Sequence, residues 1–216
     1  MFAIARAEIG TRILDTKQLI TLVRTFEVPN PLEAALCKGL IFVQLYGAYE
    51  YAVQSSVQGI LLSIRNDGLA PRDLHARSLT LVLDSAFLSA STAGPRRLWA
   101  RRLGLVSRFD DSSPLQALDN TLFPADGTHY RVGQLQTIWD IFGVSVPVVP
   151  EARLLGRIDE LVENRNSIAH GRQRPEQVGR RYSIQEVERR IDDVEKIAMH
   201  IVSVLETHYT NGGVRR

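Results

Sequence analysis

Seven consecutive residues, from Arg165 to Gly171, place an arginine, a polar side chain and a histidine at the end of an apolar segment. They read Arg-Asn-Ser-Ile-Ala-His-Gly. An arginine can neutralise the charge on a pentacoordinate phosphate, and a histidine can transfer protons near neutral pH. These two types of side chain are sufficient, in principle, to cleave RNA without a metal ion.

Helical spacing determines how these groups can meet. Asn166 and His170 lie about one turn apart, so the amide can fix the tautomer of the imidazole. Arg165 and His170 lie roughly 140° apart around one helix, which points them poorly at a single phosphate. Two copies of the helix that cross at a twofold axis would bring the arginine of one chain to the histidine of the other. The spacing therefore favours a composite site in a homodimer.

A structural interpretation of the same residues stays open. Arg165 shares a stripe with apolar residues, where an arginine is often held in an ion pair, and a histidine before a glycine is often only a helix end. Glu50 is the one charged residue between Lys38 and Arg65, and it is a candidate for the buried partner of Arg165. Residue types and spacing alone therefore leave both a catalytic and a structural role open.

The elements that must hold the motif are helical, because no segment alternates as a β-strand does. The motif ends a predicted helix over residues 151–170, with Gly171 as its terminating glycine. The last helix starts at the capping box Ser183-x-x-Glu186 and keeps a seven-residue apolar repeat suited to packing along one partner helix. Further helices are predicted over residues 5–26, 32–65, 72–89 and 132–142, with an irregular loop over 107–130, a basic connector over 172–181 and a frayed tail from residue 210. The fold class predicted is an all-α bundle of about six to seven helices.

Composition is that of one globular domain. The chain has 216 residues, a hydrophobic content of 44% and a net charge of +2, so overall charge indicates no particular partner. The lone Cys37 excludes an intrachain disulfide, and no histidine outside the motif has ligand-spaced neighbours, so neither a metal site nor another cofactor is predicted. Residues 1–13 lack a signal-peptide core, and polar residues interrupt the apolar second helix. We therefore expect a cytoplasmic protein without a membrane span.

Several other side chains have two interpretations each. Arginines beside the motif are candidates for binding RNA phosphates or for a solvated connector: Arg172, Arg174, Arg180 and Arg181. A second basic group is expected to form a helix face: Arg96, Arg97, Arg101 and Arg102. Large aromatic residues are expected to be core or dimer contacts: Trp99, Trp139, Tyr46, Tyr49 and Tyr51.

The run from Leu161 to Gly171 matches the Arg-x4-His signature of the HEPN superfamily, with the polar Asn166 directly after the arginine. It resembles the MAE-type branch of HEPN-like nucleases, as do the preceding helix end Phe142-Gly143-Val144 and the apolar second helix with Glu50. The similarity spans residues 31–209. We therefore expect an N-terminal helix over 1–30, a HEPN-like helical domain over 31–209 and a flexible tail over 210–216.

This resemblance implies a metal-independent endoribonuclease that acts as a homodimer, often as a toxin or phage-defence effector. Arg165 would stabilise the phosphorane, His170 would be a general acid or base, Asn166 would orient the site, and Glu50 would be a supporting residue at best. The RNA 2′-hydroxyl would attack its own phosphate and leave a 2′,3′-cyclic end.

The resemblance also bears on partners. An antitoxin or a neighbouring defence protein is the partner that it implies. Some members carry a tyrosine two residues after the histidine, which an antitoxin modifies with AMP; Arg172 stands there, so this regulation is not expected. The alternative function is a non-catalytic HEPN module that dimerises and binds a nucleotide, RNA or a partner protein.

Overall fold

The computed structural model describes residues 1–115 and 129–216, and in these residues it contains nine α-helices, three short 3-10 helices and no β-strand. The predicted all-α class is confirmed. The 3-10 helices span Pro71–Asp73, Arg108–Asp110 and Ala152–Leu154. The α-helices are α1 (Phe2–Phe26), α2 (Pro31–Asn66), α3 (Ala76–Val82), α4 (Asp84–Ser91), α5 (Leu98–Ser107), α6 (Val132–Phe142), α7 (Leu155–Ala169), α8 (Pro175–Gly179) and α9 (Ile184–Thr210).

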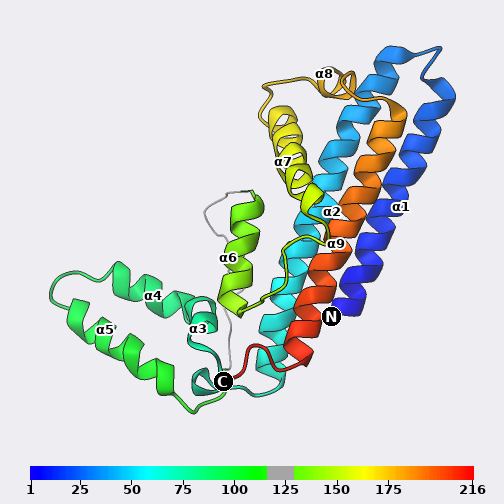
Figure 1. Ribbon diagram of the computed structural model, residues 1–216. Coiled ribbons are helices and arrows are strands. Elements are labelled where there is room, and N and C mark those ends of the chain that lie inside the picture. The colour runs from blue at the N-terminus through cyan, green and yellow to red at the C-terminus, as the bar shows by residue number, and fades with distance from the viewer. Residues whose placement is uncertain (116–128) are drawn as a thin grey trace.

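Three long helices, α1, α2 and α9, lie side by side and form the body of the molecule (Figure 1). Helix α2 is the central element, because α1, α7, α8 and α9 all pack against it. Its sequence explains this position: a helix that is apolar on nearly every side must be surrounded by others. One continuous hydrophobic cluster extends through α1, α2, α6, α7 and α9, so the N-terminal helix shares the core of the rest.

Helix α9 begins where the sequence predicts. The Ser183 N–H donates to Glu186 Oε2 at 2.8 Å, and the Glu186 N–H donates to Ser183 Oγ at 3.2 Å, which confirms the capping box. The seven-residue repeat is buried throughout α9. It packs against both α1 and α2, however, and not along a single partner helix.

The segment predicted as one helix over residues 72–89 is divided into a 3-10 turn, α3 and α4. One tertiary contact and one local side-chain hydrogen bond take the place of helical hydrogen bonds at its start. Leu74 forms an antiparallel bridge to Arg215, and the Asp73 carboxylate accepts a hydrogen bond from the Ala70 N–H at 2.9 Å. A second break falls at Leu83, which ends α3 and precedes α4.

The C-terminal residues pack against the body near the end of α2, at the point where C marks the chain end in Figure 1. Val214 is fully buried, and its carbonyl accepts a hydrogen bond from the His75 N–H at 3.0 Å. Arg215 Nη2 lies 2.7 Å from Asp67 Oδ2. The structure therefore differs from the predicted frayed tail over 210–216, because an apolar side chain near its end is buried.

Helices α4 and α5 extend away from the three-helix body (Figure 1). Helix α5 has no buried residue. Trp99 is 74% exposed, and the Arg102 Cζ lies 5.2 Å from the centre of its ring. Trp99 therefore lies outside the core, whereas Trp139 is buried as predicted. Part of the irregular loop predicted over 107–130, residues 116–128, lies outside the described residues.

The basic connector after the motif contains a helix that the sequence did not indicate, α8. It approaches α2 through two glycines. A Cβ at Gly39 would lie 1.9 Å from the Pro175 carbonyl oxygen, and a Cβ at Gly179 would lie 1.9 Å from the Ala35 carbonyl oxygen. Close backbone contact therefore fixes the chain that follows the motif. None of the helices in residues 1–115 and 129–216 is both long and apolar enough to span a membrane.

Gly39→Ala is expected to lower the free energy of unfolding by about 1–3 kcal/mol, because the added methyl group meets backbone that cannot rotate away. Gly47→Ala, on the same helix, is the matched control. A Cβ there meets nothing within 4 Å, so its higher helix propensity should leave stability unchanged or raise it by up to about 1 kcal/mol. Urea unfolding of both variants measures the difference, and equal effects would contradict the glycine contact.

Candidate functional site

The motif helix α7 is held by an apolar stripe on one side. Leu154, Ile158, Leu161 and Val162 are buried, and the next position on this stripe is Arg165. The helix ends at Ala169, with His170 as its C-cap and Gly171 in the left-handed conformation at φ +68°. A glycine adopts this conformation at little cost, so the predicted helix end is confirmed.

A polar network fixes the other side of α7 to α9. Glu160 accepts hydrogen bonds from Arg190 Nε at 3.0 Å, from Arg157 Nη1 at 2.8 Å and from the Tyr182 hydroxyl at 3.0 Å. Tyr182 in turn accepts from Asn164 Nδ2 at 2.9 Å. Burial alone would raise the pKa of Glu160, but the hydrogen bonds from Arg190 and Arg157 outweigh it and lower the pKa. The network therefore contains a carboxylate that stays charged and bridges two helices.

Arg165 lies on an aromatic ring and not against a carboxylate. Its Cζ is 4.8 Å from the centre of the Tyr46 ring, and its Nη1 donates to Asn166 Oδ1 at 3.1 Å. Glu50 accepts a hydrogen bond from the Tyr46 hydroxyl at 3.2 Å. In the part of the chain that the structure describes, no carboxylate lies within 4.0 Å of the Arg165 guanidinium. The alternative of a buried Arg165–Glu50 ion pair is therefore wrong.

His170 is exposed at the end of α7. Its ring centre lies 6.4 Å from that of His129, and the two rings are inclined at 63°. Asn166 is buried, and its side-chain oxygen is occupied by Arg165, while its backbone carbonyl accepts the His170 N–H at 3.0 Å. The amide therefore positions the guanidinium, in place of the contact with the imidazole that the spacing predicted.

Arg165, Asn166 and His170 form one cluster with Tyr46, Glu50 and His129. Tyr46 and His129 were not identified from the sequence as site residues. The Tyr46 hydroxyl lies 3.2 Å from His129 Nδ1, and the two rings meet edge to face with centres 5.7 Å apart. The i,i+4 spacing of Tyr46 and Glu50 was a usable signal for the tyrosine. His129 carried no such signal, because it comes from a loop 83 residues further along the chain than Tyr46.

The electrostatics of the cluster favour an uncharged tyrosine and an uncharged His129. Burial, followed by the nearby Glu50 carboxylate, raises the pKa of Tyr46 well above its ordinary value. Burial also lowers the pKa of His129, and the positive charge of Arg165 lowers it further. The cluster thus brings the Arg165 guanidinium together with an uncharged Tyr46 hydroxyl, an uncharged His129 imidazole and the exposed His170 ring.

The four arginines proposed from the sequence for RNA binding lie along the segment that crosses from α7 over α8 to α9 (Figure 1). All are exposed. Arg172 Nη2 is 3.6 Å from Glu163 Oε1, and Arg174 Nη1 is 3.9 Å from Glu176 Oε1. Arg181 donates to Gln173, and Arg180 follows α8 directly. These four arginines, the arginine row, follow the motif along the chain. They are not part of the Arg165–His170 cluster.

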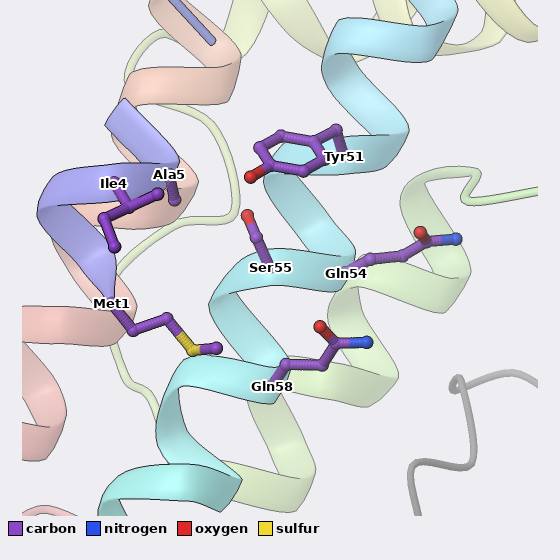
Figure 2. A pocket seen from close by; sticks show the side chains of 7 residues that line it. All are labelled: Met1, Ile4, Ala5, Tyr51, Gln54, Ser55 and Gln58. Carbon is purple, nitrogen blue, oxygen red and sulfur yellow. The ribbon is translucent and has the colours of Figure 1, made fainter. Parts of the chain in front are cut away.

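A surface pocket of about 320 Å³ lies further along α2, between this helix and the start of α1. Figure 2 shows Tyr51 and Ser55 directed towards α1, and Gln54 and Gln58 directed to the opposite side. Gln54 hydrogen-bonds Tyr130, the neighbour of His129. None of the site residues predicted from the sequence lines this pocket. Among residues 1–115 and 129–216, no group of three or more His, Cys, Asp or Glu side chains is arranged to hold a metal ion.

The chain matches one known protein family over most of its length. Residues 7–209 match the family described as HEPN_MAE_28990/-like HEPN. The chain belongs to this family. The match confirms the MAE-type HEPN resemblance and extends it into α1, which the sequence motifs had left out. HEPN families are associated with ribonucleases and RNA-related modules. No curated protein and no solved structure shows significant similarity to the chain.

Glu160→Ala is expected to lower the free energy of unfolding by about 2 kcal/mol, because mostly buried arginine partners lose their carboxylate. Glu188→Ala is the control, because it breaks the exposed Arg24–Glu188 pair between α1 and α9. It should change the free energy of unfolding by less than about 1 kcal/mol. Guanidinium unfolding at pH 7 measures both.

The pH dependence gives a second readout. Because the pKa of Glu160 is lowered by folding, its contribution is present above the ordinary glutamate pKa of about 4.3 and is lost as the pH falls below it. The stability difference between the natural chain and Glu160→Ala should therefore shrink in acid. A difference that is constant with pH would show that the carboxylate charge is unimportant.

Proposed function

We propose that this HEPN protein is a metal-independent endoribonuclease in which Arg165 and His170 carry out the cleavage. The observation that supports this most is the environment of Arg165. Its guanidinium lies on the Tyr46 ring, is held by Asn166, and has no carboxylate within 4.0 Å among the described residues. A structural arginine on an apolar stripe would be expected to have such a partner. An uncompensated guanidinium is suited to bind a phosphate.

The proposed reaction needs a cation and proton transfer. The RNA 2′-oxygen bonds to the adjacent phosphorus, and Arg165 stabilises the negative charge that develops on the phosphoryl oxygens. The P–O5′ bond then breaks, leaving a 2′,3′-cyclic phosphate and a 5′-hydroxyl. His170, exposed at the end of the same helix, exchanges a proton with a reacting oxygen. Glu50 supports the site through Tyr46.

RNA would approach along the exposed arginine row beside His170, formed by Arg172, Arg174, Arg180 and Arg181. Exposed arginines bind phosphates without regard to sequence, so this row would contribute affinity and not specificity. A toxin or phage-defence role, with an antitoxin or neighbouring defence protein as partner, is part of the proposal and rests on the family resemblance.

Purified protein is expected to cleave total RNA in the presence of EDTA and to leave 2′,3′-cyclic ends. Arg165→Ala and His170→Ala should each reduce the rate by about 100-fold or more, with helical circular dichroism retained. Arg96→Ala and His75→Ala replace the same residue types outside the cluster and should cleave as the natural chain does. Cleavage that persists in either site variant would point to a contaminant or another site. RNA binding without cleavage would favour the non-catalytic HEPN module.

We also propose that the protein is a homodimer, and the placement of the two residues allows a sharper test of the site. The composite arrangement expected from spacing takes arginine and histidine from different chains. Within one chain, however, Arg165 lies on Tyr46 and His170 faces His129, and Tyr46 and His129 are in contact with each other. This arrangement supports a site that is complete in each subunit.

Co-expression of differently tagged Arg165→Ala and His170→Ala chains distinguishes the two arrangements. A heterodimer purified by both tags should remain inactive if each site lies in one chain. If the sites are composite, one of the two sites in this heterodimer combines the natural Arg165 of one chain with the natural His170 of the other. Cleavage would then recover to about half of the natural rate. Light scattering on the natural chain tests the dimer itself.

A further inference from the structure

The proposed reaction requires a group that removes the 2′-hydroxyl proton and a second group that protonates the 5′-oxygen. Only one histidine of the cluster, His170, belongs to the sequence motif. A second imidazole, His129, lies just before α6, with its ring centre 6.4 Å from that of His170. One oxygen that hydrogen-bonds to both rings would separate the two bonded nitrogens by at most about 6 Å, which is close to the separation of the ring centres. The rings are therefore near enough to contact one phosphodiester.

The hydrogen bonds around His129 determine which nitrogen carries its proton. The Tyr46 hydroxyl has one proton, and it donates this proton to Glu50 Oε1 at 3.2 Å. Its oxygen can then only accept from His129 Nδ1, which is 3.2 Å away. The chain His129–Tyr46–Glu50 therefore places the imidazole proton on Nδ1 and leaves a lone pair on Nε2. A carboxylate that fixes a histidine tautomer in this way prepares the ring to accept a proton.

The surrounding charges act in the same direction. Burial lowers the pKa of His129, and Arg165 and His170 from α7 and Arg131 at the start of α6 lower it further. Glu50 from α2 acts in the opposite sense but does not outweigh them. Tyr46 keeps its proton, because burial and Glu50 raise its pKa. At neutral pH the ring is therefore uncharged, as a base must be.

We infer that His129 is the general base of the site and His170 its general acid, which deepens the proposed function and rests on it. His129 Nε2 takes the proton of the 2′-hydroxyl as that oxygen bonds to phosphorus. The P–O5′ bond breaks, and O5′ leaves with the proton that His170 donates. His129 ends protonated and His170 ends neutral, so protons and electron pairs balance. Tyr46 and Glu50 are positioning residues that act through His129.

Cleavage by His129→Ala is the first test, with the exposed His75→Ala as the matched control. His129→Ala should cleave RNA about 100-fold or more slowly with an unchanged thermal unfolding midpoint, and His75→Ala should retain the natural rate. If His129→Ala cleaves normally while His170→Ala does not, the inference fails and the proposed nuclease function stands. If the natural chain does not cleave RNA, both fail.

An RNA whose scissile 5′-oxygen is replaced by sulfur separates the acid from the base. A thiolate leaves without being protonated, because a thiol is far more acidic than an alcohol. The sulfur substrate should therefore restore cleavage by His170→Ala but not by His129→Ala. Restoration of His129→Ala alone would reverse the assignment and overturn it.

The pH profile tests the positioning residues with a readout that a purely structural role would not change. Cleavage should fall as the pH drops through the pKa of His129, which lies below its ordinary value. Glu50→Gln removes a negative charge that raises this pKa, so the acidic limb should move to lower pH. Tyr46→Phe, which removes the hydroxyl but keeps the ring under Arg165, should slow cleavage at every pH. An acidic limb at the natural position in Glu50→Gln would contradict the relay.

Discussion

The hydrogen bond from Tyr46 to Glu50 holds one aromatic ring against which the whole cluster is assembled. Arg165 lies on the face of this ring, and His129 meets it edge on and bonds its hydroxyl. A face rich in π electrons attracts a cation, while the single phenolic proton sets the direction of the hydrogen bonds. One side chain therefore supports the guanidinium and orients the imidazole, and it does so from a rigid helix.

This arrangement is possible because α2 is almost uncharged. The hydrophobic effect surrounds such a helix with others, and α1, α7, α8 and α9 all pack on it. Among its few charges, Lys38 is buried but lies 2.8 Å from Glu27, and Glu50 is partly buried and bonded to Tyr46. A carboxylate in this position is costly without a partner. The neighbouring hydroxyl lowers that cost and, in doing so, links the core to the surface cluster.

Much of the fold followed from the sequence, whereas the cluster followed only in part. Periodicity and caps located α1, α2, α6, α7 and α9, because long amphipathic or apolar helices carry strong local signals. The segment over 72–89 and the tail were predicted wrongly, since pairing between Leu74 and Arg215 is a contact between distant parts of the chain. The same limit applies to the site. Local spacing and residue type made Arg165 and His170 the predicted site residues, but no local pattern brings His129 to Tyr46.

The unequal surroundings of the two tryptophans give the molecule a built-in pair of optical reporters. Trp139 on α6 is buried in the core, while Trp99 on α5 is 74% exposed on the projecting helices. Buried indole emits at shorter wavelength than indole in water, so the two contributions to intrinsic fluorescence are separable. Trp99→Phe would leave an indole that reports on the core at α6, and Trp139→Phe would leave one that reports on the α4–α5 projection.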